Sequence, residues 1–180
     1  MDFSQIKLHI EAYKKYHQIE DAARFLIRSF GLEDPNLEGF VFREDFKADY
    51  IALTTEGDFG KPQKMRIPPN IFDFDIRLVL NMIAHEMLHV RQKTRQPFVD
   101  DKNEREWQAH YEMLFHNVFP QIPDMTDFFI KSFALKALEY YRRMGEGSEL
   151  QQQYLQQKIE VENLLNEVLV RRGELKISED

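Results

Sequence analysis

The chain has 180 residues, of which 43% are hydrophobic and 31% are charged, a balance that excludes a disordered protein and favours one ordinary domain with a real core. The absence of cysteine excludes disulfide bonds and thiolate metal ligands, and a net charge of −7 without a basic run argues against nucleic acid as a partner. No stretch reaches the roughly 18 consecutive apolar residues of a membrane span, and the amphipathic N-terminus lacks a signal-peptide core. We therefore expect a protein that is cytoplasmic or otherwise unexported and has no membrane partner.

The first part of the chain predicts helices followed by short strands. Apolar residues recur at helical spacing over residues 3–30 and stop at Gly31, which indicates one or two helices. Apolar or alternating stretches at 39–44, 49–55 and 61–67 then indicate a small, mostly antiparallel sheet. Because prolines lie in and beside the last stretch, we expect it to be an edge strand, since proline cannot donate to a ladder on both sides.

The chain then predicts a succession of helices. Asp73 or Asp75 can cap a helix that Pro97 stops, and apolar residues extend nearly all round this helix, so it should be buried on most sides. A second helix is expected within residues 100–119, with an acidic start that the helix dipole favours. A third is expected over residues 124–144.

The C-terminal part predicts one more helix. Gly145 and Gly147 break the chain, and Ser148 forms a capping box with Gln151 that opens a helix running to Gly173. Its apolar positions recur at alternating spacings of three and four, which is typical of a packing seam. We expect this helix to dock on the third one as a helical hairpin, with a role in self-association or partner binding as the alternative.

Two histidines flank a glutamate in "HEMLH", residues 85–89, late in the predicted buried helix. On a helix, His85 and His89 project from one face a turn apart, so both rings can bind a single ion at the bond length of about 2 Å that zinc makes to nitrogen. Glu86 lies about 100° round the helix from His85, where its carboxylate can accept a proton from a metal-bound water as general base. The alternative is a pair of hydrogen-bonded core histidines beside a surface glutamate.

A catalytic metal site needs a third protein ligand and one open position. Residues 90–95, directly after the second histidine, contain neither glycine nor histidine, so the ligand must come from elsewhere. On a helical wheel Glu104 lies on the apolar side of the next predicted helix, where a lone carboxylate would be costly unless it met a cation. The candidates on that helix are Glu104, Glu106, His110 and Glu112.

The motif "HEMLH", with weaker support from "EWQAH" at residues 106–110, resembles the zincin superfamily of metallopeptidases, in particular small gluzincin-like members. In the glutamate-zincin pattern the ligand Glu is followed by an aromatic residue, any residue, Ala and Asp. The resemblance implies Zn²⁺ as cofactor, His85, His89 and Glu106 as its ligands, and Glu86 as general base.

The chain departs from that pattern at His110, which stands where the family often has an aspartate. His110 could orient a ligand imidazole or bind zinc itself. The third ligand therefore stays open among Glu106, Glu104 and His110. The three remaining histidines are isolated on predicted helical surfaces or edges and are expected to be solvated: His9, His17 and His116.

The resemblance also implies a fold and a function. We expect an α+β protein with a zincin-like domain over residues 1–120 and a C-terminal helical pair over residues 121–180, packed on it or used for assembly. The expected activity is that of a zinc-dependent peptidase, with a peptide substrate along the edge strand near residues 61–67. The alternative is a catalytically silent zincin-like binding or assembly component, similar to those of phages and mobile elements.

Overall fold

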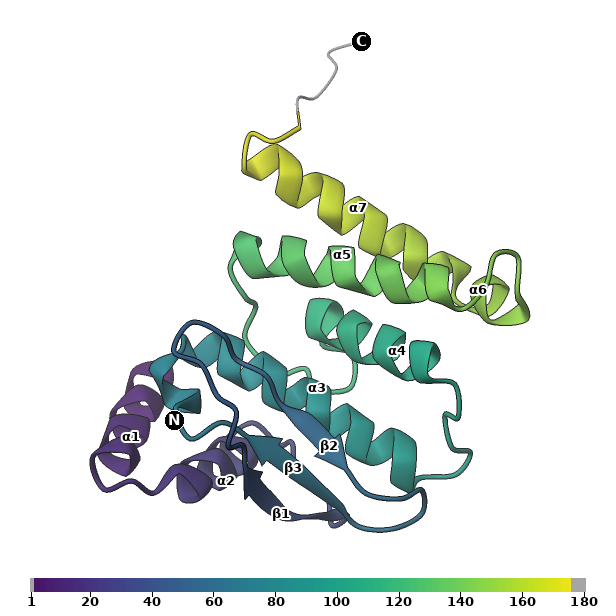
Figure 1. The fold of residues 1–180 in the computed structure, drawn as a ribbon. Coiled ribbons are helices and arrows are strands. Elements are labelled where there is room, and N and C mark those ends of the chain that lie inside the picture. The colour runs from purple at the N-terminus through teal and green to yellow at the C-terminus, as the bar shows by residue number, and fades with distance from the viewer. Residues whose placement is uncertain (1, 176–180) are drawn as a thin grey trace. The chain divides into compact units, whose positions relative to one another are not determined.

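Helices and a small sheet of three strands make up the computed structural model, which describes residues 2–175 and confirms the expected α+β class (Figure 1). The contacts divide these residues into two compact units. The first extends to Phe98 and includes Phe119–Pro123, whereas the second comprises Val99–Val118 and the described residues from Asp124 onward.

The first unit begins with the two helices α1 (Phe3–Lys15) and α2 (Ile19–Ser29), as predicted. A capping box fixes the start of α1, because the Asp2 carboxylate accepts the Gln5 main-chain N–H and the Gln5 side chain accepts the Asp2 N–H. The two helices pack on one another through buried apolar residues, with Leu26 of α2 fully buried.

The sheet consists of β1 (Leu37–Phe42), β2 (Thr54–Glu56) and β3 (Gln63–Ile67), in the order β1-β3-β2. Because β3 pairs in parallel with β1 and antiparallel with β2, the sheet is mixed, where we had expected a mostly antiparallel one. The cause is the connection over residues 43–53, which carries the chain from β1 to the far edge of the sheet before it returns as a hairpin into β3.

The prediction that residues 61–67 form an edge strand is wrong, because β3 lies between the other two strands. Pro62 and Pro68 stand directly before and after this strand, so neither removes a hydrogen-bond donor from its ladder. The two edges of the sheet are therefore β1 and β2. A peptide that added to this sheet would have to pair with one of them.

The helix α3 (Ile76–Thr94) follows the short 3₁₀ helix η1 (Ile71–Asp73) and is buried along most of its length, as predicted. The Asp75 carboxylate caps it by accepting the main-chain N–H groups of Arg77 and Leu78. In the first unit α3 contacts β2, which places the edge strand beside this helix. Neither α3 nor any other helix within residues 2–175 has the apolar length needed to cross a membrane.

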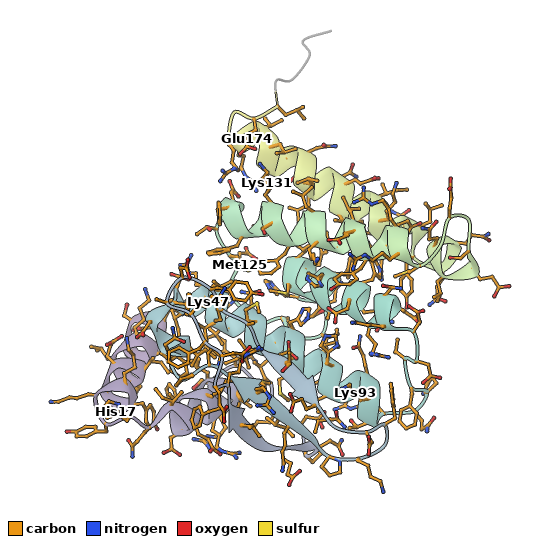
Figure 2. All side chains as sticks on the ribbon, in the orientation of Figure 1. His17, Lys47, Lys93, Met125, Lys131 and Glu174 are labelled. Carbon is orange, nitrogen blue, oxygen red and sulfur yellow. The ribbon has the colours of Figure 1, made fainter. Side chains whose placement is uncertain are left out.

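The second unit contains the expected helical hairpin, formed by α5 (Asp127–Arg143) and α7 (Leu155–Arg171). Arg171 at the end of α7 forms an ion pair with Asp127 at the start of α5, at 2.8 Å between Nη2 and Oδ1, so the two helices run antiparallel. Lys131 and Glu174, both labelled in Figure 2, form a second ion pair at the same end of the hairpin.

The last helix is not continuous, in contrast to the prediction of one helix ending at Gly173. A short helix α6 (Glu149–Gln153) is capped by Ser148, and the chain then breaks at Tyr154 before α7 begins. The ring of Tyr154 is buried, and its phenol donates to the Glu104 carboxylate. No local helix signal in the sequence reveals this break or the partner of the tyrosine.

The helix α4 (Lys102–Phe115) contacts α5 and α7 and belongs to the second unit. Its Trp107 is fully buried against the rings of Tyr141 and Tyr154, with ring centroids 5.2 Å and 6.3 Å away. This aromatic core joins α4 to the hairpin. The observed division therefore differs from the boundary expected at residue 120.

Candidate metal centre

The two histidines of "HEMLH" meet on one face of α3, as their spacing predicts. Nε2 of His85 and Nε2 of His89 lie 3.1 Å apart, and the ring planes are nearly perpendicular, at 88°. Two nitrogen ligands at tetrahedral angles around one ion, with bonds of about 2.05 Å, lie roughly 3.3 Å apart. The separation of the two nitrogens therefore suits a shared metal ion.

Gln92 fixes the orientation of His89. Nδ1 of His89 lies 2.7 Å from Oε1 of Gln92, and both side chains are buried. Because an amide oxygen only accepts hydrogen bonds, Nδ1 carries the hydrogen, and Nε2 of the neutral ring holds a lone pair that faces His85. Sequence reasoning did not assign this role, although a Gln one turn after a candidate ligand is a signal that could have suggested it.

The lone pair of His89 permits two arrangements of the histidine pair. Nε2 of His85 can carry a hydrogen and donate it to His89, or a cation can bind both nitrogens. Binding of a metal ion displaces that hydrogen, because both imidazoles must offer a lone pair to the ion.

Glu86 lies beside the histidine pair and is buried, with 4% of its surface exposed. Ligand atoms of His85, Glu86 and His89 all lie within 4.8 Å of one another. The alternative prediction, which placed Glu86 at the surface, is therefore wrong. These three residues form a group that could hold a metal ion, with the carboxylate near enough to take part as a ligand or as a base.

Thr55 of the edge strand β2 contacts Glu86 directly. Its hydroxyl Oγ1 lies 2.8 Å from the carboxylate oxygen Oε2 of Glu86 and 3.0 Å from the main-chain carbonyl oxygen of the same residue. Sequence reasoning missed Thr55, because nothing local to β2 announces a contact with a residue 31 positions away.

Lys93 ties the last part of α3 to the same strand. Its Nζ donates to the Thr55 carbonyl oxygen at 2.9 Å, and its own carbonyl accepts the main-chain N–H of Gly60 at 2.8 Å (Figure 2 labels Lys93). The side-chain and main-chain oxygens of Thr55 are therefore both held against α3. The base candidate and the sheet edge are thus fixed to one another within the first unit.

Glu104 of α4 has its partners inside the second unit. Its Oε1 accepts the phenol hydrogen of Tyr154 at 2.6 Å and lies 3.4 Å from the Gln108 amide nitrogen. Burial and then the Glu104 hydrogen bond raise the pKa of Tyr154 to about 12, so the phenol stays protonated as a donor. The hydrogen bond from the Tyr154 phenol, without any cation, therefore explains how the Glu104 carboxylate is accommodated on the apolar side of α4.

Glu112 is also held within the second unit. Its two carboxylate oxygens accept the main-chain N–H of Val118 at 2.9 Å and 3.0 Å, which secures the chain just after α4. This contact gives the fourth candidate ligand a structural role.

Glu106 and His110 stand together on another face of α4. Nδ1 of His110 lies 2.8 Å from the Glu106 carbonyl oxygen and 3.9 Å from its carboxylate Oε2. Nδ1 therefore carries the hydrogen, and Nε2 of the neutral ring carries the lone pair. Burial and then the Glu106 charge raise the pKa of the neighbouring Tyr140. Because α4 belongs to the second unit, a third ligand from it stays a prediction.

We compared the chain with protein-family models, with curated proteins and with solved structures, and no comparison found a match. The resemblance to zincins therefore depends on the two motifs alone.

Proposed function

We propose that the protein is a zinc-dependent peptidase that uses His85 and His89 as zinc ligands and Glu86 as general base. The observation that carries the proposal is the 3.1 Å separation of the two Nε2 atoms, at the distance expected for two ligands of one ion, beside a buried carboxylate. A core histidine pair would not need a carboxylate at its side. A metal ion accounts for all three residues together.

Glu106 is the third ligand that we propose. Its competitors Glu104 and Glu112 accept hydrogen bonds from Tyr154 and Val118, whereas Glu106 pairs on α4 with His110, an arrangement suited to a ligand carboxylate and its supporting imidazole. His110 is kept as the alternative ligand. When bound, zinc would lower the pKa of a water to about 7 and polarise the scissile carbonyl.

Glu86 would move the proton in this reaction. Its carboxylate accepts the proton of the attacking water and then returns it to the leaving amine, so one residue serves as base and as acid. Only 4% of the Glu86 surface is exposed, and this burial keeps competing water away from the carboxylate.

A peptide substrate would bind along β2 and not along residues 61–67. β2 is an edge strand, contacts α3, and carries the residue that touches Glu86. An extended peptide that adds to this edge would have its main chain beside the histidine pair.

A binding or assembly component is the second candidate function. Exposed apolar side chains on the hairpin favour it, with Leu135 of α5 and Leu155 of α7 about half exposed, at 49% and 51%. In that case the chain would self-associate or bind a partner through α5 and α7, and Glu86 would have no chemical role.

Zinc content and hydrolysis of a mixed peptide library, measured on the same samples, test the proposal. Glu86→Gln should retain zinc and lower turnover by about 10²–10⁴-fold, because general-base catalysis contributes that much. Undiminished hydrolysis by this variant would remove Glu86 from the mechanism. A wild-type protein that binds zinc stoichiometrically but cleaves no peptide would favour the assembly function.

The third ligand is tested by zinc content alone. His85→Ala and Glu106→Ala should lose zinc, whereas Glu104→Ala is the matched control on the same helix and should retain it. Loss of zinc from His110→Ala with retention in Glu106→Ala would transfer the ligand role to His110.

A further inference from the structure

Thr55 of the edge strand β2 contacts Glu86, the proposed base, through its side chain. Its hydroxyl reaches both the carboxylate and the main-chain carbonyl of Glu86. A hydroxyl has one hydrogen to donate, so the two acceptors compete for it. The carboxylate oxygen is the nearer of the two acceptors, at 2.8 Å against 3.0 Å, and we take it as the hydrogen-bond partner.

The main chain of Thr55 is held independently of its hydroxyl. β2 pairs Thr55 with Met65 of β3, and Lys93 binds the Thr55 carbonyl oxygen. Threonine is also stiff at χ1, so the hydroxyl direction is set once the backbone is fixed. The hydroxyl therefore presents a hydrogen at a fixed place beside Oε2.

We propose that Thr55 is a positioning residue for Glu86, an inference that rests on the peptidase function proposed above. The Thr55 hydrogen bond to Oε2 holds the carboxylate in one orientation, from which it accepts the proton of the attacking water. The proton then passes from the carboxylate to the leaving amine, and the bond to Thr55 is unchanged throughout. The edge strand that would bind the peptide thus also orients the base that acts on it.

The kinetic test compares three substitutions on β2. Thr55→Val keeps the shape and removes the hydroxyl, and it should lower kcat by about 10-fold with little change in KM, as is typical when a supporting contact is lost. Thr55→Ser keeps the hydroxyl and should restore most of the activity. Thr54→Val makes the same chemical change at the adjacent exposed residue of the strand, and it should leave kcat and KM unchanged.

Equal kcat values for Thr55→Val and wild type would overturn the inference while leaving the peptidase function intact. A wild type without peptidase activity would overturn the proposed function instead. Loss of activity in Thr55→Ser as large as in Thr55→Val would also contradict the inference, because the hydroxyl would then not be the group that matters.

A second readout needs no activity and uses metal-free protein. A double-mutant cycle on Thr55→Val and Glu86→Ala should give shifts in the unfolding midpoint that do not add, because each change removes the same hydrogen bond. Additive shifts would mean that the hydroxyl binds only the main-chain carbonyl, which remains in Glu86→Ala, and would overturn the positioning role.

Discussion

Gln92 lies one turn beyond His89 on α3 and holds that ring through its Nδ1 hydrogen. We predict that Gln92→Leu lowers zinc affinity by about 10–100-fold, because the ring loses the contact that fixes its orientation and the position of its hydrogen. Gln92→Glu is the matched control and should keep the affinity, since a carboxylate accepts from the same hydrogen. Titration with a chromophoric chelator measures both, and equal affinities for all three proteins would contradict the orienting role.

At the residue scale, spacing was sufficient to find the histidine pair and its glutamate, because a helix places positions four apart on one face whatever surrounds it. It was not sufficient for Thr55, whose contact with Glu86 depends on how a strand packs against a helix. A helical wheel shows only the neighbours of Glu104 on its own helix, so this residue was a credible ligand. Only the position of the Tyr154 phenol, 50 residues away, gives this carboxylate another partner.

Tyr154 stands between α6 and α7, with its ring buried and its phenol bonded to the Glu104 carboxylate. We predict that Tyr154→Phe destabilises the fold by about 1–2 kcal/mol, because the buried ring is kept while the hydrogen bond to the Glu104 carboxylate is lost. Tyr16→Phe, at an exposed tyrosine with 66% of its surface accessible, is the control and should leave stability unchanged. Chemical denaturation measures both variants, and zinc content should be the same in each.

At the element scale, the capping residues that begin helices were predicted, whereas the break at Tyr154 and the central place of β3 in the sheet were not. Capping residues such as Asp75 and Ser148 act on their own helix and can be recognised in the sequence. Strand order depends on where the connection over residues 43–53 crosses the sheet, which no local signal specifies. Pro62 and Pro68 were misleading because they stand just outside the two ends of β3 and do not interrupt it.

His116 links the stability of the molecule to pH. It ends α4 in a left-handed conformation, with φ of 49°, and its side chain is only 10% exposed, so the expectation of a solvated histidine is wrong. Burial lowers the pKa of His116 below its usual value near 6.5, although the Asp124 carboxylate and a hydrogen bond with the Met113 main chain oppose the shift.

A lowered pKa means that the fold favours the neutral ring. The stabilisation from His116 is therefore complete above about pH 6.5 and is lost as the pH falls toward the folded-state pKa, because the unfolded chain then binds the proton more readily. We predict that the free energy of unfolding falls less between about pH 7 and pH 5 in His116→Asn than in wild type, since Asn also tolerates the left-handed conformation. Parallel denaturation curves at the two pH values measure this difference, and identical slopes would contradict it.

The Lys93 ammonium donates to the Thr55 carbonyl oxygen on β2, a strand at the edge of the sheet. The rim of an open sheet usually offers main-chain acceptors to any neighbouring chain, and such rims seed fibrillar stacking. Here the middle residue of a three-residue rim already has a charged donor from its own helix. Pairing at this border, by a substrate peptide or by a second copy of the protein, therefore first requires the ammonium to leave the Thr55 carbonyl, which opposes fibrillar stacking.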